Sequence, residues 1–394
     1  MTERLYYHDS GLLTFQATIV GSRDEDGRSV TVLDRSAFYP TSGGQQFDTG
    51  RLNDCDIIDV SETEDGQVRH YSVQRVGEVG DEVAGLVDRD RRRRHCCLHT
   101  GQHILSHVSM QLYELKTVSV HLGDEYGAVE LDGGSLSPED IIRLELRANE
   151  IVGRAHPVEI IFAEGDELAA LPLRKPPKRS GRIRVINIGD FEYSACGGTH
   201  CANSSEIGVV KIIGVEKIRG HVLIKFLVGV QAFDDYCARF EVTSELARKF
   251  TCHYKDLPEK IESLTGQQKE LKQELVGLYK EILPIRADKL AAPVIAKEGR
   301  LLGAESDLPG ARLMSQLAQL IAERIHGVAL LSRENRLVLA VAEESPFDAR
   351  KLAAQLSERF GVKGGGNRLL AQVGGAESTM LREYEMFVKG LIEE

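Results

Sequence analysis

Short stretches of alternating apolar and polar residues dominate the first 94 positions, and Gly and Asp turns separate them. β-Branched residues are frequent in these stretches, as is typical of strands. The stretches are TFQATIV (14–20), RSVTVLD (28–34), DCDIIDV (54–60) and QVRHYSV (67–73). A small barrel or a strongly bent sheet fits this rhythm, so we predict a β-barrel-like domain over residues 1–94.

From Arg94 onward the hydrophobic period lengthens to that of a helix, over residues 94–115 and again over 137–156, where Ser137 is a plausible N-cap. Four strand-like segments follow, at 158–164, 183–189, 208–218 and 221–229. We therefore predict an α+β domain over residues 95–235.

A polar helical stretch over residues 236–290 comes next. Its seam steps by three and four residues through Ile261, Leu264, Gln268, Leu271, Leu275, Leu278 and Ile282. This heptad pattern indicates either a coiled coil between two chains or a helical hairpin with FEVTSELARKF (240–250).

Residues 291–394 alternate between helical and strand patterns and predict a compact α/β unit. Helices are expected at 313–325, 348–360 and 380–392, strands at 327–333 and 336–343, and a Gly-rich turn at 363–375. The fold class as a whole is α+β: an N-terminal β-barrel, an α+β domain, a helical linker and a small α/β domain.

Composition is ordinary for a globular protein, with 42% hydrophobic and 28% charged residues. No apolar run approaches the roughly 18 residues of a membrane span, and the first residues lack the apolar core of a signal peptide. The seven cysteines are an odd number without the spacing of a disulfide scaffold. We therefore expect reduced thiols, a cytoplasmic location and no membrane partner.

The net charge of −11 argues against indiscriminate binding to nucleic acid. Positive charge is nevertheless clustered in two runs, RDRRRRH (89–95) and RKPPKRSGRIR (174–184). Each run alone is compatible with a solvated surface. Because one run precedes each of the two metal-ligand motifs described next, together they favour a phosphate-bearing substrate.

Two pairs of metal-ligating residues stand in HTGQH (99–103) and ACGGTHC (195–201). On a helix, His99 and His103 lie on one face, and the glycines between Cys196 and His200 allow a tight turn. Imidazole and thiolate donors suit Zn²⁺, so we predict that these four residues bind one zinc ion. Rival ligands are His107, Cys96, Cys97 and Cys201, and the sequence contains no HExxH motif.

The motifs HTGQH and SACGGTHCANSSEIG, with SAFYPTSGGQQFDTG (36–50) before them, resemble the editing domain of alanyl-tRNA synthetase and the free-standing AlaX family. The resemblance covers residues 5 to about 230. The C-terminal GGGNRLLAQVGG resembles a DHHA1-type domain, although its second Gly cluster is reduced and interrupted by Val373. We expect no synthetase core before the barrel, so the resemblance implies a long-form AlaX protein acting in trans.

This resemblance implies a zinc-dependent hydrolase that cleaves the aminoacyl ester of tRNA(Ala) mischarged with serine, with glycine as a further candidate. Such a site must accept serine and refuse alanine, which a hydrogen bond to the substrate hydroxyl achieves. By resemblance, Thr41 is the residue expected to make this bond, with Gln45 lining the same pocket. The alternative for Thr41 is that it merely caps its turn.

Another class of function stays open: a non-catalytic RNA-binding module in which four protein ligands close a structural zinc site. A phosphoesterase role suggested by the tail lacks metal motifs of the right type. For residues 291–394 we expect a contribution to tRNA affinity or to a homodimer, the leucine seam pairing either between chains or within a hairpin.

Overall fold

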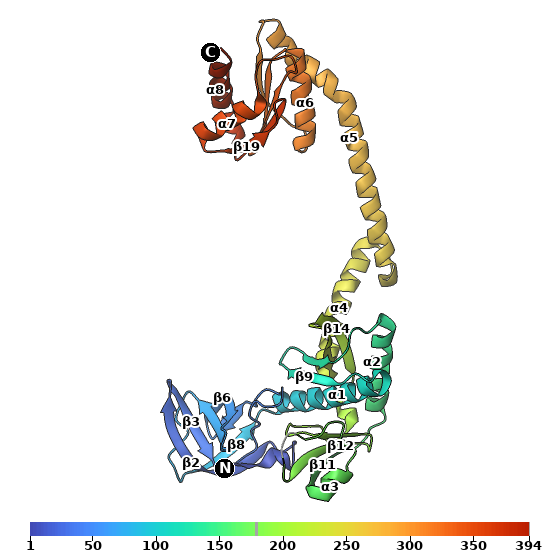
Figure 1. Ribbon diagram of the computed structural model, residues 1–394. Coiled ribbons are helices and arrows are strands. Elements are labelled where there is room, and N and C mark those ends of the chain that lie inside the picture. The colour runs from blue at the N-terminus through green and yellow to red at the C-terminus, as the bar shows by residue number, and fades with distance from the viewer. Residues whose placement is uncertain (178–179, 394) are drawn as a thin grey trace. The chain divides into compact units, whose positions relative to one another are not determined.

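The computed structural model describes residues 1–177 and 180–393, so Lys178 and Arg179 of the second basic run lie outside the described residues. The chain forms two compact units, Met1–Ser244 and Glu245–Glu394 (Figure 1). Helix α4 (Gly229–Phe250) runs across the boundary between them. No helix in the described ranges combines the length and the apolar character that crossing a bilayer requires.

The N-terminal region is a closed β-barrel, as the alternating pattern predicted. Its strands follow one another around the barrel in the order β2, β3, β7, β6, β5, β8. Buried side chains such as Ile19, Leu33 and Val60 fill the interior. The strands are β1 (Glu3–Arg4), β2 (Thr14–Glu25), β3 (Arg28–Leu33), β4 (Arg35–Ser36), β5 (Gly50–Leu52), β6 (Cys55–Glu62), β7 (Val68–Ser72) and β8 (Glu82–Val87), of which β1 and β4 pair outside the barrel.

Helix α1 (Arg89–Tyr113) leads out of the barrel and carries HTGQH. It begins five residues before the predicted start, because the Asp88 side chain caps it by accepting a hydrogen bond from Arg91 N. Helix α2 (Pro138–Gly153) has the predicted Ser137 N-cap, completed by Asp140 as a capping box.

Two antiparallel sheets lie on either side of α1 (Figure 1). Their orders are β14-β15-β10-β9 and β11-β12-β13, and they share a core with α1 and α2 through residues such as Leu105, Ile186 and Phe226. The elements are β9 (Thr117–Leu122), β10 (Gly127–Leu131), β11 (Val158–Ala163), α3 (Gly165–Ala170), β12 (Ile183–Ile188), β13 (Glu192–Ala195), β14 (Val210–Ile218) and β15 (His221–Val228).

The C-terminal unit is a five-stranded sheet in the order β16-β17-β18-β20-β19, with helices on both faces. Helix α6 and the end of α5 cover one face, and α7 and α8 cover the other. The elements are α5 (Leu257–Ile295), β16 (Leu301–Glu305), α6 (Ala311–Arg324), β17 (Val328–Arg333), β18 (Arg336–Val341), α7 (Ala349–Phe360), β19 (Lys363–Gly366), β20 (Leu370–Gly374) and α8 (Leu381–Glu393).

The Gly-rich segment at 363–375 was predicted as a turn, and this was wrong. It forms the hairpin β19–β20, in which Gly364 pairs with Val373. A Cβ at Gly364 would lie 2.9 Å from Cγ2 of Val373, and one at Gly366 would lie 2.2 Å from the Leu370 carbonyl oxygen. The glycines therefore permit a close strand pairing instead of a loop.

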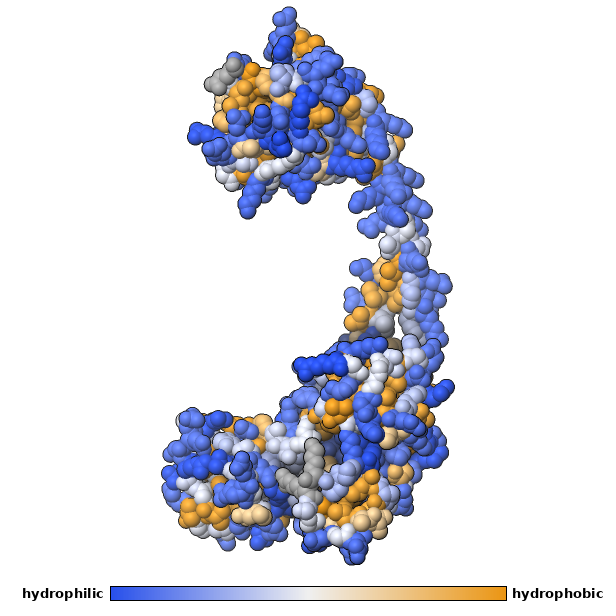
Figure 2. Space-filling model, in the orientation of Figure 1, coloured by the Kyte–Doolittle hydropathy of each residue, from blue (hydrophilic) through white to orange (hydrophobic). Residues whose placement is uncertain are grey.

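The predicted heptad seam lies on the first two thirds of α5, a single helix of 39 residues. Apolar side chains gather at the surface of the helical stretch in Figure 2. The six apolar members of the seam are between 38% and 64% exposed in the described structure. The helix is confirmed, and the partner of its seam stays a prediction.

Candidate metal centre

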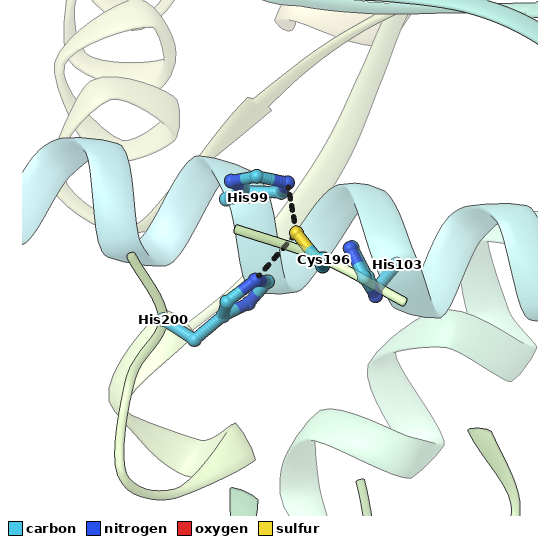
Figure 3. Close-up of side chains that lie close together, drawn as sticks. All are labelled: His99, His103, Cys196 and His200. Carbon is cyan, nitrogen blue, oxygen red and sulfur yellow. Dashed lines mark hydrogen bonds between the residues drawn. The ribbon is translucent and has the colours of Figure 1, made fainter. Parts of the chain in front are cut away.

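The four predicted ligands converge in the N-terminal unit. His99 and His103 come from α1, and Cys196 and His200 come from the turn that follows β13 (Figure 3). One donor atom from each lies within 4.8 Å of the other three. The Cys196 Sγ is 3.4 Å from Nε2 of His99 and 3.4 Å from Nε2 of His200. The three histidines are buried, and the Cys196 residue is intermediate in exposure.

Gln45, in the Gly-rich segment SAFYPTSGGQQFDTG (36–50), fixes the orientation of His99. Nδ1 of His99 lies 2.8 Å from Oε1 of Gln45, which makes that nitrogen the donor and leaves Nε2 for the cluster. The Gln45 amide also makes two hydrogen bonds to Thr199. The Thr199 N–H donates to Oε1 of Gln45, and Nε2 of Gln45 donates to Oγ1 of Thr199. Gln45 is fully buried, so it ties the barrel side of the site to the CGGTH turn.

Thr100 does the same for His200. Its Oγ1 donates to the Cys96 carbonyl oxygen and lies 3.3 Å from Nδ1 of His200. The Cys201 N–H also donates to the Thr100 Oγ1, at 3.1 Å. The turn is therefore attached to α1 next to its ligand, and Nε2 of His200 faces the cluster.

Glu192 on β13 stands behind His103. Its Oε1 is 3.6 Å from Nδ1 of His103, and its Oε2 is 3.4 Å from Nδ1 of His107. Arg174 donates to Oε1 at 2.8 Å. Burial raises the pKa of Glu192, but His107 and Arg174 outweigh this effect, and the pKa falls to about 2. The carboxylate is thus charged and faces the histidine whose Nδ1 lacks another partner in the described structure.

Burial also sets the charge of the four candidate ligands. It lowers the pKa of His103 to about 4 and lowers those of His99 and His200 well below their ordinary value. These imidazoles are therefore neutral at neutral pH, the form that binds a metal. Burial raises the pKa of Cys196, although the Gly198 N–H and Arg184 oppose it. Only a cation in the cluster would make this thiol a stable thiolate.

Gly198 is required where it stands. A Cβ on this residue would lie 2.1 Å from Cε1 of His99 and 2.9 Å from Oε1 of Gln45. The backbone of the CGGTH turn therefore passes directly over the His99 ring. This close approach explains why a glycine precedes Thr199.

A buried ion pair joins the barrel to α1 about two turns before His99. Arg92 and Asp48 are 2% and 0% exposed, with Nη2 and Oδ2 2.6 Å apart. Arg92 also donates to the carbonyl oxygens of Ser10 and Ala37. Ser10 in turn accepts a hydrogen bond from the His200 N–H through its Oγ.

Several cations of the two basic runs are used within the fold and are not free for a phosphate. Arg91 binds Asp124 and the Phe47 carbonyl oxygen. Arg184 is buried and donates to the carbonyl oxygens of Cys196 and Gly198, so it supports the turn itself.

Arg89 and Arg93 lie elsewhere, in the wall of a cavity of about 790 Å³ that reaches His200. Fewer cations of the two runs are therefore left to bind a phosphate than the sequence suggested, and Arg89 and Arg93 are among those that remain.

Thr41 lies in the exposed part of the Gly-rich segment. Its Oγ1 accepts a hydrogen bond from the Phe47 N–H at 3.1 Å, which is the turn-capping contact, and its hydroxyl proton has no acceptor among the described residues. The rival ligands His107, Cys96, Cys97 and Cys201 are outside the four-donor group.

The supporting residues Glu192, Thr100, Ser10 and Arg184 were not identified from sequence. For Arg184, the available signal was a charged residue inside the mainly apolar strand β12.

Comparison with known proteins adds three findings. Residues 183–222, which include Cys196 and His200, match the family model described as threonyl and alanyl tRNA synthetase second additional domain. The alanyl-tRNA editing protein AlaX-L of Pyrococcus horikoshii is 30% identical over 392 residues, covering 94% of each chain.

Alanine–tRNA ligases are also similar. That of Archaeoglobus fulgidus is 29% identical over 98% of this chain but only 43% of its own length, and that of Frankia alni is 28% identical over 96% and 45%. The chain thus spans less than half of these ligases and nearly all of AlaX-L. With the N-terminal barrel, the synthetase-type match over the CGGTH turn and the full-length likeness to AlaX-L, the chain belongs to the AlaX-L family of alanyl-tRNA editing proteins.

Proposed function

We propose that this protein is a trans-editing deacylase that hydrolyses the aminoacyl ester of tRNA(Ala) mischarged with serine, with a zinc ion at the four-residue centre. The observation that carries the proposal is the convergence of one thiol and three neutral imidazoles within 4.8 Å of one another. The name of the Pyrococcus relative, an alanyl-tRNA editing protein, supports the substrate class.

The donor set supports zinc as the metal. Three imidazole nitrogens and a thiolate are ligands that Zn²⁺ takes readily, whereas Mg²⁺ and Ca²⁺ prefer oxygen. Gln45 and Thr100 bind the outer nitrogens of His99 and His200, an arrangement common around protein-bound zinc. When bound, zinc would supply Lewis-acid polarisation to the ester or to the attacking water.

Selectivity is assigned to the Gly-rich segment. The hydroxyl proton of Thr41 remains to donate to the substrate's side-chain oxygen, while its oxygen accepts from Phe47 N–H. An alanyl ester would leave this donor without a partner, which disfavours alanine relative to serine. Gln45 is proposed to act through His99, because both ends of its amide are already bound.

The alternative function is that of a non-catalytic, zinc-stabilised RNA-binding module. It is favoured by the number of protein donors, because four would complete the shell of a structural zinc site and leave no open position. The cavity of about 790 Å³ whose wall includes His200 favours the enzyme instead, because it brings open space up to the centre.

The C-terminal unit is proposed to be a DHHA1-type domain that increases affinity for tRNA and holds two chains together. The apolar side chains of the seam on α5 are exposed, and pairing them with a second copy would bury them. The last third of the same helix is packed against its own sheet through Leu283, Ala287 and Ala291. We therefore propose a homodimer formed along Ile261–Ile282.

Removing a ligand tests the metal and the chemistry together. We expect one zinc per chain in the purified protein and hydrolysis of Ser-tRNA(Ala) that a chelator abolishes. In His103→Ala and Cys196→Ala, hydrolysis should fall by more than the roughly 10–100-fold typical of losing an outer-shell partner. Metal analysis and ester release from Ser-, Gly- and Ala-tRNA(Ala) measure both. Full zinc content and unchanged hydrolysis in both variants would refute the assignment, and stoichiometric zinc without any turnover of wild type would favour the binding module.

Glu192 is expected to strengthen zinc binding by orienting His103. Glu192→Gln keeps the shape and removes the charge, so the affinity for zinc should fall by roughly 10–100-fold. Competition with a chromophoric chelator measures it, and circular dichroism verifies the fold. Asp190→Asn is the matched control, two residues earlier on the same hairpin and away from the cluster. Equal zinc affinity in both variants would show that Glu192 serves only its ion pair with Arg174.

Thr41→Val retains the shape of the side chain and removes its hydroxyl. The preference for Ser-tRNA(Ala) over Ala-tRNA(Ala), as a ratio of kcat/KM values, should drop by roughly two- to tenfold, the net worth of about 0.5–1.5 kcal/mol for one hydrogen bond. Ser42→Ala removes a hydroxyl from the neighbouring exposed position and should leave the ratio unchanged. If the ratio in Thr41→Val also stays at its wild-type value, Thr41 only caps its turn.

Charge on the seam should separate the dimer. Sedimentation velocity is expected to show a dimer for wild type and a monomer for Leu271→Glu combined with Leu278→Glu, because burying carboxylates at the seam costs free energy. The control Gln273→Glu with Lys280→Glu adds charge two residues from each seam position, on an exposed face, and should remain dimeric. A monomeric wild type, or a dimer that survives the seam change, would contradict the pairing.

A further inference from the structure

Two cysteines that lie outside the four-donor group meet beside the centre. Cys97 lies on α1 two residues before His99, and Cys201 follows His200 directly. Their sulfurs are 3.7 Å apart, with the Cys201 thiol donating towards Cys97. All seven cysteines of the chain are described and carry free thiols, and this is the pair recorded in sulfur–sulfur contact.

A cavity opens onto Cys201, and Cys97 lies directly behind its wall. Its volume is about 790 Å³, and its wall includes Cys201, Arg93 and Glu206. The carbonyl oxygen of Glu206 is 3.4 Å from the Cys97 sulfur, so the cavity wall adjoins both thiols. Each cysteine retains a small exposed fraction, 7% for Cys97 and 5% for Cys201.

We propose that Cys97 and Cys201 are a reversible dithiol–disulfide pair, oxidised by a low-molecular-weight disulfide, that cross-links the two segments carrying the metal ligands. The Cys97 thiolate attacks one sulfur of the small disulfide and releases one small thiol. The Cys201 sulfur then attacks the mixed disulfide at Cys97 and expels the second. Two protein S–H bonds are replaced by one S–S bond, and the two electrons and two protons pass to the small disulfide, which leaves as two thiols.

The required movement is small. An S–S bond is about 2.04 Å long, so the sulfurs must approach by roughly 1.7 Å from 3.7 Å. The Cys201 backbone is held to α1 through its N–H bond to Thr100, so rotation of the two side chains must supply the approach. The contact already joins α1 to the turn that bears Cys196 and His200.

The disulfide would connect the same two segments of the chain as the metal. It closes a loop between residues 104 positions apart, which restricts the unfolded chain. A metal at the four-residue centre would tie the same two segments together. Oxidation should therefore stabilise the metal-free protein more than the zinc-loaded protein, and this comparison alone rests on the proposed zinc site.

The test uses the full-length protein and glutathione disulfide as the probe. After native incubation, remaining thiols are alkylated and the digested protein is mapped without reduction. We expect a peptide pair joined through Cys97 and Cys201, two fewer alkylated thiols, and full reversal by dithiothreitol. The midpoint of thermal unfolding of the metal-free protein should rise by at least about 5 °C.

Variants make the mapping decisive. Cys201→Ser should trap glutathione on Cys97, and Cys97→Ser should remove the bridge. Cys96→Ser, which changes the adjacent thiol, should leave the bridge intact. The proposal is overturned if wild type carries a persistent glutathione adduct without a bridge, if the bridge joins other cysteines, or if both thiols stay reduced while Cys237 and Cys252 react. Because the readout is covalent, an inactive or zinc-free protein would not decide it.

Discussion

The buried pair of Arg92 and Asp48 is the interaction on which the site depends. Ion pairs this deeply buried are costly to break from one side, by roughly 3–5 kcal/mol, because the remaining charge has no partner. The Arg92 guanidinium also donates hydrogen bonds to the carbonyl oxygens of Ser10 and Ala37. It therefore fixes the first turns of α1 against the Gly-rich segment 36–50. This contact positions His99 and His103, which lie seven and eleven residues further along the helix.

From this joint, three parts of the N-terminal unit each support one imidazole. The barrel side contributes Gln45 to His99, the helix contributes Thr100 to His200, and strand β13 contributes Glu192 to His103. Each support occupies or faces an Nδ1, so the Nε2 atoms of His99 and His200 point inward at the sulfur of Cys196. The orientations of His99 and His200 are thus set by hydrogen bonds that exist without a metal, and His103 faces the Glu192 carboxylate at 3.6 Å. This arrangement reduces the reorganisation that metal binding requires.

The sequence predicted the parts of this arrangement that depend on local periodicity. The i, i+4 spacing of His99 and His103 and the two glycines before His200 are local features, and the structure brings these residues together. Four of the six barrel strands, β2, β3, β6 and β7, and the capped start of α2 were predicted for the same reason, whereas β5 and β8 were not.

What the sequence could not reveal depends on contacts between distant segments. Arg92 and Arg184 belong to runs that look solvated, and only the tertiary fold shows that both are buried. Gln45 meets His99 across 54 residues, and Glu192 looks like any acidic residue near a turn. The hairpin β19–β20 was missed because glycine signals a turn by composition, whereas here its missing side chain permits close pairing with Val373 and Ala371.

We propose that one thiolate and three imidazoles hold a single metal ion, and the spectrum of a Co²⁺-substituted protein reports this donor set. Metal-free protein titrated with one equivalent of Co²⁺ should develop intense visible bands of a four-coordinate ion and a near-ultraviolet thiolate-to-metal charge-transfer band. Cys196→Ala should lose the charge-transfer band, and added Zn²⁺ should displace the cobalt. Weak bands typical of six-coordinate cobalt, or a charge-transfer band that persists in Cys196→Ala, would contradict the account.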